Sequence, residues 1–278
     1  STIPNSGFET WISMGNYNNP DSWSCLNDVT ALANTYTCVK GTPGNEGAAY
    51  IKLTSKNVLG LGIMPGIALC GKLDIVNVDA STGFAYSEKP LSLTGKWQYM
   101  ASGNDQGFIG VLLTKWDNNM MMRDTIAYAY YPLTGMAMSW ASFTINLTYM
   151  STDAPDSAVI VLSASEADGV APASGSYLYV DGLNFTGTYT SVTENSFDAG
   201  ISIFPNPANE NLTIDLSVLN NKNVSLEVTN VLGKRVKEIN NVFASSNTIL
   251  DVADLPKGNY LLKVISGGET FKRTFVKQ

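Results

Sequence analysis

Apolar and polar residues alternate along several short segments in the first two thirds of the chain. Phe143–Tyr149 places apolar side chains at every second position, which is the pattern of a strand with one buried face. Ala158–Leu162 is a short continuous apolar run, as expected of a central strand in a sandwich. Tyr177–Val180 is another apolar segment, and we expect Asp181-Gly182 to end it in a turn. The pattern predicts short strands and no long helix.

Two longer segments extend this pattern. Leu91–Met100 contains Gly95, a candidate β-bulge, and its large apolar residues share one parity: Leu91, Leu93, Trp97 and Tyr99. Phe108–Trp116 predicts a further strand that turns at Asp117-Asn118-Asn119. Met136–Ala141 is too short for a helix and has no capping residue, so we expect a loop there. Many short strands separated by Gly, Asn, Asp and Pro predict a β-sandwich.

The last part of the chain repeats the pattern on a smaller scale. About seven short strands are predicted within roughly 80 residues, a number and size that suit an immunoglobulin-like sandwich. These segments are Ile201–Phe204, Asn211–Leu216, Ser225–Asn230, Val236–Ile239, Thr248–Val252, Gly258–Ile265 and Glu269–Val276. None of them brings an obvious cluster of catalytic residues.

Composition divides the chain near residue 196. All five Trp, all nine Met and all three Cys lie before that point. Residues 1–196 carry 8 Lys and Arg against 16 Asp and Glu, a net charge of −8, whereas residues 197–278 carry 9 against 8, a net charge of +1. A run rich in Thr, Ser and Asn joins the two parts, which predicts two domains with a short linker.

The absence of histidine excludes several kinds of site. The 278 residues hold no histidine, so a Ser-His-Asp triad, a Cys-His dyad and a His-ligated zinc ion are excluded. The chain has a net charge of −7 and Arg123 is the one arginine before residue 196, which makes nucleic acid an unsuitable partner. No apolar run approaches the ~18 residues of a membrane-spanning helix.

The three cysteines allow two interpretations. A disulfide between Cys25 and Cys38 would close a loop worth roughly 3 kcal/mol in the chain-entropy model and would leave Cys70 over. Alternatively, all three are small buried apolar residues. A catalytic cysteine would need an activating neighbour, and no histidine exists to supply it.

Four motifs in the last part of the chain carry a family resemblance. They are Phe204-Pro205-Asn206-Pro207-Ala208, Val231-Leu232-Gly233-Lys234, the segment Leu255–Val264 and Phe271-Lys272-Arg273. In this order they resemble the C-terminal sorting domain of the type IX secretion system of Bacteroidetes. The resemblance implies a secreted or cell-surface protein whose C-terminal domain engages the type IX secretion machinery and is normally cut off at the surface. The predicted domains are therefore residues 1–187, a linker at 188–197, and a sorting domain at 198–278.

The first domain resembles a second kind of family at its two ends. The opening segment Asn5–Trp11 with Pro20–Trp23, the segment Glu46–Leu53, and the closing segment Gly175–Leu183 are similar to jelly-roll carbohydrate-binding modules and to a carbohydrate metabolism domain common in Bacteroidetes. Pro90–Tyr99 looks like the central strand of the same domain. The predicted fold class is therefore all-β, with a jelly-roll β-sandwich followed by a small immunoglobulin-like β-sandwich.

The resemblance also implies a structural calcium ion. In such jelly rolls the first and last strands lie together, which would bring Glu9 close to Asp181. Two carboxylates and nearby backbone carbonyls form the oxygen-only ligand set that calcium prefers. The alternative is that Glu9 accepts backbone N–H groups and that Asp181 opens a turn.

An aromatic platform for sugars is the second candidate site. Sugar rings stack on Trp and Tyr while their hydroxyls bind polar groups at the rim. Trp116 with Asp117 and Asn118 is the preferred platform, because this Trp ends a strand beside a polar turn; further aromatic candidates include Trp97, Tyr99 and Trp140. The shared parity of Trp97 and Tyr99 with Leu91 and Leu93 favours burial instead.

Three functions remain open from the sequence. We expect an exported surface protein whose first domain binds a polysaccharide or other glycan. A glycoside hydrolase would need two facing carboxylates, and no motif pairs two acids of this domain. A structural or adhesive surface protein would have no glycan site.

Overall fold

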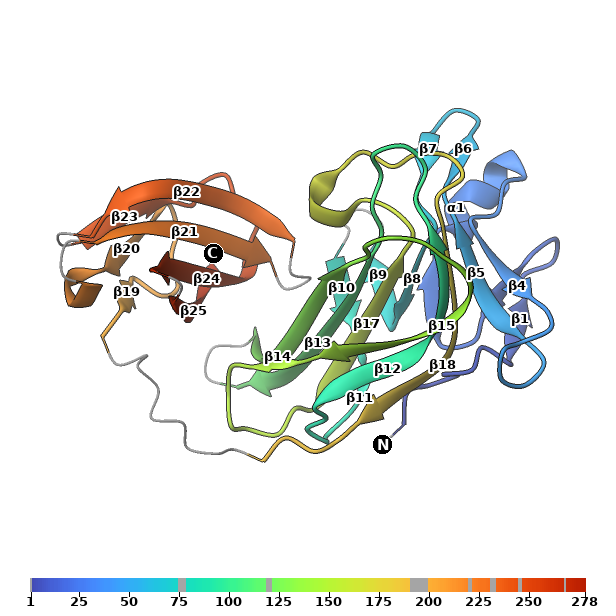
Figure 1. Cartoon of the computed structure of the whole chain (residues 1–278), viewed down its shortest axis with the longest axis horizontal. Coiled ribbons are helices and arrows are strands. Elements are labelled where there is room, and N and C mark those ends of the chain that lie inside the picture. Colours follow the sequence, from blue (N-terminus) through green and yellow to red (C-terminus); the bar gives the residue numbers. More distant parts are fainter. Residues whose placement is uncertain are drawn as a thin grey trace.

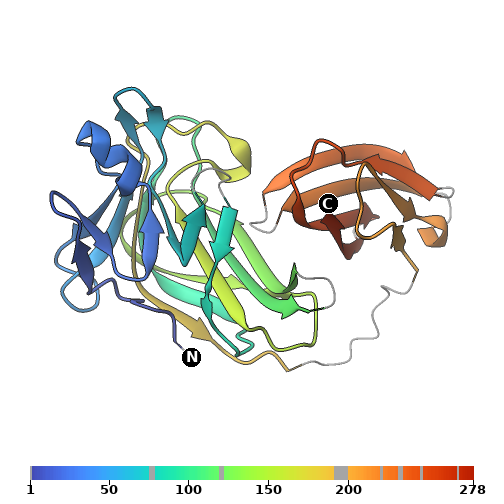
Figure 2. The ribbon, with the colours of Figure 1, turned by 180° about the vertical axis from the view of Figure 1, so that it is seen from behind.

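The chain folds into two groups of β-sheets, each with its own hydrophobic core. The structure is a computed structural model that describes residues 2–74, 79–118, 122–190, 200–219, 222–230, 234–244, 247–267 and 269–278. One core draws its fully buried side chains from Ile3 to Leu183, and the other from Ile201 to Phe275. Figure 1 and Figure 2 show the two groups from opposite sides, the first in blue to yellow and the second in orange to red. Residues 191–197, which make up most of the predicted linker, lie outside the described residues.

Two antiparallel sheets form the N-terminal sandwich (Figure 1). The seven-stranded sheet has the order β16 (Thr148–Tyr149), β14 (Met122–Pro132), β13 (Phe108–Asp117), β17 (Ser157–Ser163), β8 (Ile67–Cys70) and β3 (Trp23–Cys25), with β11 (Phe84–Ala85) also paired to β17. The five-stranded sheet has the order β15 (Ala137–Asn146), β12 (Ser92–Met100), β18 (Tyr177–Thr186), β5 (Tyr50–Thr54) and β4 (Cys38–Gly41).

Apolar side chains from both sheets fill the space between them. Ile51, Leu53 and Leu93 come from the five-stranded sheet and are fully buried; Ile109 and Ile160 face them from the seven-stranded sheet. Removing this much apolar surface from water is the main term that stabilises the sandwich. Because alternate residues of a strand point to opposite faces, the same packing sends the residues between them to the outer face.

Three short hairpins and several helical turns lie outside the two main sheets of the sandwich. Three hairpins pair β1 (Trp11–Ser13) with β2 (Asn18–Pro20), β6 (Lys56–Val58) with β7 (Gly62–Met64), and β9 (Lys72–Asp74) with β10 (Asp79–Thr82). The helical turns are α1 (Asn27–Thr30), η1 (Ala31–Ala33) and η2 (Ala167–Gly169). In the described part of the chain no helix has the length and apolar character needed to span a membrane.

Several features predicted from the pattern are confirmed in this sandwich. All seven residues of β17 are buried, as expected of a central strand. Phe143 and Ile145 of β15 are buried while Thr144 between them is exposed, which is the predicted alternation. The bulge predicted at Gly95 lies instead on the neighbouring strand, because two residues of β18, Gly182 and Leu183, face the single Gly95 of β12.

Two local predictions were wrong. Asp181-Gly182 does not end its strand, because β18 continues to Thr186. The pair lies at the irregular register between β18 and β12, where Gly182 has a φ of +58°. Met136–Ala141 is not a loop: β15 begins at Ala137, and the pairing of Ala137 with Tyr99 draws this segment into the sheet. The predicted turn at residues 117–119 starts on the last residue of β13, and Asn119 lies outside the described residues.

The C-terminal group is a seven-stranded sandwich. A three-stranded sheet has the order β19 (Ser202–Phe204), β20 (Asn211–Asp215) and β23 (Asn247–Asp251), with the helical turn η3 (Ser217–Leu219) after β20. A four-stranded sheet has the order β22 (Arg235–Phe243), β21 (Asn223–Asn230), β24 (Gly258–Ser266) and β25 (Glu269–Lys277). Each predicted strand of this part has its counterpart, and the all-β fold class is confirmed.

Candidate functional site

Half-buried aromatic side chains gather on the outer face of the five-stranded sheet. On β18, Tyr177 and Tyr179 alternate with the fully buried Leu178 and Val180, so their rings point away from the core. We call the outward side chains of this sheet the aromatic face, defined by Tyr50, Lys52, Lys96, Gln98, Trp140, Tyr177 and Tyr179.

Neighbouring strands supply the rest of this face in register. Tyr179 lies opposite Lys52 of β5 on one side and opposite Gln98 of β12 on the other. Tyr50 precedes the buried Ile51 on β5, and Trp140 lies on β15 with the same parity as the exposed Ser142. The face therefore spans the strands from β15 to β5.

The rings contact one another across the sheet. Tyr177 stacks on Tyr179 with ring centroids 4.6 Å apart and planes at 25°. Tyr50 lies 5.8 Å from Tyr179 and 5.0 Å from Trp140, the latter edge-on at 89°. Aromatic pairs in these geometries attract one another beyond the effect of burial, so the rings are held in place before any ligand arrives.

The contact between Tyr50 and Trp140 spans the width of the aromatic face. These residues belong to β5 and β15, which are separated in the sheet by β18 and β12. Strands lie about 4.8 Å apart, so the two side chains reach each other over the strands between them. The aromatic residues therefore form one connected cluster across the outer face of the sheet.

A glycine makes room for one of the rings. Gly41 of β4 pairs with Tyr50, and a Cβ atom at position 41 would lie 2.2 Å from Cζ of the tyrosine. No heavy atom tolerates such an approach, so any larger residue here would displace the ring. Gly41 thus fixes where Tyr50 can lie.

Polar and cationic groups accompany the rings. The Lys52 ammonium lies 5.0 Å from the ring centroid of Tyr179, within the range of a cation–π interaction. Lys96 donates a hydrogen bond to the Ser142 hydroxyl at 2.8 Å. Together with Gln98, these groups offer donors and an acceptor beside apolar ring faces, which is the chemistry that a sugar ring requires.

The five strands of this sheet contain a single acidic residue, Asp181. It is fully buried, and its Oδ2 atom accepts the N–H groups of Asn45 at 2.7 Å and Glu46 at 2.8 Å. Its Oδ1 atom accepts the N–H of Gly182 at 2.8 Å. Burial raises the pKa of the Asp181 carboxyl, although the three N–H donors counteract that effect. The sheet therefore presents no pair of carboxylates to a ligand.

Of the predicted platform residues, Tyr99 lies in the core between the two sheets. It is 1% exposed, its hydroxyl accepts the N–H of Gly107 at 2.9 Å, and it belongs to the core between the sheets. Trp97 stacks on it with planes at 9° and packs against the same core. Both share the inward parity of Leu93, so neither offers a free ring face.

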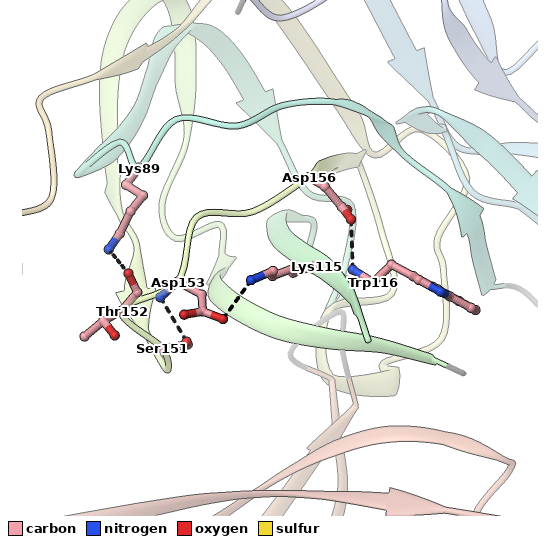
Figure 3. A network of polar contacts seen from close by, with 7 residues as sticks. All are labelled: Lys89, Lys115, Trp116, Ser151, Thr152, Asp153 and Asp156. Atoms are coloured by element: carbon pink, nitrogen blue, oxygen red, sulfur yellow. Dashed lines mark hydrogen bonds and ion pairs between the residues drawn. The ribbon is translucent and has the colours of Figure 1, made fainter. Parts of the chain in front are cut away.

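The structure places Trp116 in the other sheet, away from the aromatic face. It lies near the end of β13, with Asp117 as the last residue of that strand and the exposed Asn118 after it. The indole is 40% exposed and contacts no other ring of the described residues. In Figure 3 its backbone N–H bonds Asp156, while the indole extends away from the Lys115–Asp153 ion pair. The predicted platform is thus one isolated ring.

The predicted calcium ligands lie near each other but bind backbone amides. The opening segment does meet the last strand, because the Leu183 N–H bonds the Ser6 carbonyl at 3.0 Å. Glu9 accepts the N–H groups of Ala48 and Ala49 at 3.0 and 3.2 Å. Asp181 accepts the N–H groups of Asn45 and Glu46. Among the described residues no group of three His, Cys, Asp or Glu side chains is placed to hold a metal ion.

All three cysteines are buried and free. Burial raises the pKa of the Cys70 thiol to about 12, and burial followed by a hydrogen bond with Cys25 raises that of Cys38. The thiols therefore act as small core residues, which is one of the two sequence interpretations.

The comparisons with known proteins separate the chain into the same two parts as the two hydrophobic cores. Residues 202–278 match the family model of the secretion system C-terminal sorting domain, as the four motifs predicted. This domain indicates a protein that is secreted or attached to the cell surface. No curated protein matches the chain by sequence.

Solved structures share the fold of much of the chain. A protein from Bacteroides thetaiotaomicron, provisionally named a glycoside hydrolase, is 17% identical over 69% of this chain and 72% of its own, with a TM-score of 0.54. A protein from Bacteroides vulgatus with the same provisional name is 20% identical over 65% of this chain and 96% of its own, with a TM-score of 0.54. At this identity the likeness establishes the fold and no activity.

Proposed function

Since residues 202–278 form a secretion system C-terminal sorting domain, we propose that the chain carries a glycan-binding sandwich to the cell surface, and that the aromatic face holds the glycan. The observation that supports this proposal is the contact between Tyr50 and Trp140 across the outer face of the five-stranded sheet. Residues 1–187 would be the binding unit, and the sorting domain would direct it to the secretion machinery.

The chemistry of the face favours binding over hydrolysis. Glycoside hydrolysis in its usual form needs two carboxylates on either side of the scissile bond. The strands of this sheet contain one acid, and its carboxylate is buried under the 44–48 loop. Half-buried rings with amide and ammonium groups beside them suit a saccharide chain that stacks and is then released unchanged.

Binding of this kind would use preformed rings. Tyr and Trp lose little side-chain entropy when a sugar stacks on them, because packing against one another already limits their rotamers. Tyr177, Tyr179, Tyr50 and Trp140 would contact the apolar faces of successive sugar units, and Gln98 would bond their hydroxyls. Such sites bind through a few dominant contacts.

A glycan array tests the proposal. The full chain is compared with Trp140→Ala and with Trp116→Ala, a matched control that removes an exposed indole from the other sheet. We expect at least one glycan to bind, with the signal lost in Trp140→Ala and kept in Trp116→Ala. Binding that persists in Trp140→Ala and is lost in Trp116→Ala would show that the glycan binds at the end of β13. Absence of binding to every glycan would favour an adhesive or structural role.

A further inference from the structure

The charge on the aromatic face has the opposite sign to the rest of its domain. Residues 1–196 carry 8 basic against 16 acidic residues, a net charge of −8. The aromatic face nevertheless contains Lys52 and Lys96, while the one acid of its strands, Asp181, is turned into the 44–48 loop. An acidic domain thus has one sheet face whose outward charged side chains are cationic.

Among the described residues, neither lysine forms an ion pair with an acid. Lys52 lies over the Tyr179 ring at 5.0 Å, and Lys96 bonds the Ser142 hydroxyl at 2.8 Å. No ion pair of the described residues includes either lysine, whereas Lys115, Lys237 and Lys263 each contact an acid. Their positive charge is therefore available to a ligand.

The two lysines flank the central ring. Lys52 on β5 lies directly opposite Tyr179 on β18. Lys96 lies on β12, on the other side of β18, two residues before Gln98, which is the residue opposite Tyr179. Two strand spacings and an offset of two residues along the strand separate the backbones of the two lysines by about 12 Å. A saccharide stacked on Tyr179 would pass between two ammonium groups, each able to bind a carboxylate or sulfate substituent of a sugar.

We infer that the glycan of this face is anionic, a polysaccharide that carries uronate or sulfate groups paired with Lys52 and Lys96. This inference rests on the proposed function of the aromatic face. The negative charge of the rest of the domain does not oppose it, because exposed charges beyond about 8–10 Å are screened at physiological ionic strength.

The test uses glycans matched in everything except charge. Polygalacturonate, alginate and hyaluronan are each titrated into the full chain beside their carboxyl-reduced derivatives, which keep the backbone and lose the anion. We expect one of the acidic polymers to bind and its reduced form to bind more weakly. The double variant Lys52→Gln, Lys96→Gln should lose about 2- to 30-fold in affinity, since an exposed ion pair contributes about 0.2–1 kcal/mol.

Lys40→Gln is the matched control. It removes a lysine from the same sheet, but Lys40 lies opposite the inward-facing Ile51 and is exposed at the edge strand. We expect its affinity to equal that of the wild type. Equal binding of an acidic polymer and its reduced form, or binding of neutral glycans alone through Trp140, would overturn the inference and leave the proposed function intact. Failure to bind any glycan, acidic or neutral, would overturn both.

Discussion

Trp140 meets Tyr50 edge-on, with ring centroids 5.0 Å apart, although two strands separate them in the sheet. This contact spans the outer face of the five-stranded sheet, on which we place the glycan. The position of the Tyr50 ring in this contact depends on Gly41, which offers no side chain to a sugar.

Gly41→Ala should weaken glycan binding about as much as Tyr50→Ala. The new methyl group would lie 2.2 Å from the tyrosine Cζ and would push the ring out of its place on the aromatic face. Loss of one stacking residue costs about 1–2 kcal/mol, or roughly 5- to 30-fold in Kd by calorimetry. The backbone of Gly41 needs no positive φ, so the melting temperature should change little. Wild-type affinity in Gly41→Ala, with weak binding in Tyr50→Ala, would contradict this role.

Asp105→Asn should lower stability at neutral pH. Asp105 is 7% exposed and accepts the hydroxyl groups of Ser165 and Ser176, which fixes the segment between β17 and β18. Burial by itself raises the pKa of this carboxyl, but the hydroxyl and N–H donors outweigh it and lower the pKa below 3.8. An amide cannot accept all of these bonds, so we expect a loss of about 2–3 kcal/mol in the free energy of unfolding by denaturant titration.

The sign of the pH dependence follows from that lowered pKa. A carboxyl with a lowered folded pKa stabilises the protein above its unfolded pKa, and this stability is lost as the pH falls through the folded value. The difference in unfolding free energy between wild type and Asp105→Asn should therefore shrink between about pH 5 and about pH 3. A difference that stays constant over this range would show that the charge of Asp105 contributes nothing.

Removal of calcium should leave the melting temperature of the full chain unchanged. Glu9 and Asp181 already accept backbone N–H groups from the 44–49 segment, which closes the opening segment onto the last strand without a cation. A ligand bound only by the native state must raise the melting temperature. A rise on adding calcium to chelator-treated protein would restore the calcium clamp that the family resemblance implies. Asp181→Asn, by contrast, should cost about 1–3 kcal/mol with or without calcium.

Cys70 should resist alkylation in the native protein. A pKa raised to about 12 by burial leaves roughly one thiol in ten thousand ionised at about pH 8, and the residue is fully buried. Mass spectrometry should find the three cysteines unmodified by iodoacetamide before denaturation and modified afterwards. Rapid labelling of Cys70 in the native state would contradict its burial.

Much of the fold follows from the local pattern of the sequence. The seven C-terminal strands were predictable, because period-two alternation is a local signal. The turn at Asp181-Gly182 was not, because a bulge can absorb a pair that elsewhere would turn the chain. Whether residues 136–141 join the sheet depends on their pairing with β12, which is a non-local contact.

The site was harder to predict than the fold. The strand at Tyr177–Val180 has alternating residues, so the outward parity of Tyr177 and Tyr179 could have been inferred once Leu178 and Val180 were assigned to the core. The sequence contains no sign that Tyr50 and Trp140 meet, because their contact depends on strand order. Trp116 stood out because it adjoins a polar turn, yet it lacks ring partners among the described residues.

Tryptophan fluorescence during glycan titration tests the central claim most directly. The glycan identified on the array is titrated into the wild type and into Trp140→Phe and Trp116→Phe, which keep an apolar ring at each position. We expect the emission of the wild type and of Trp116→Phe to change on binding, and that of Trp140→Phe to remain constant while calorimetry still detects binding. A change that persists in Trp140→Phe and disappears in Trp116→Phe would show that the glycan binds at the end of β13 and not on the aromatic face.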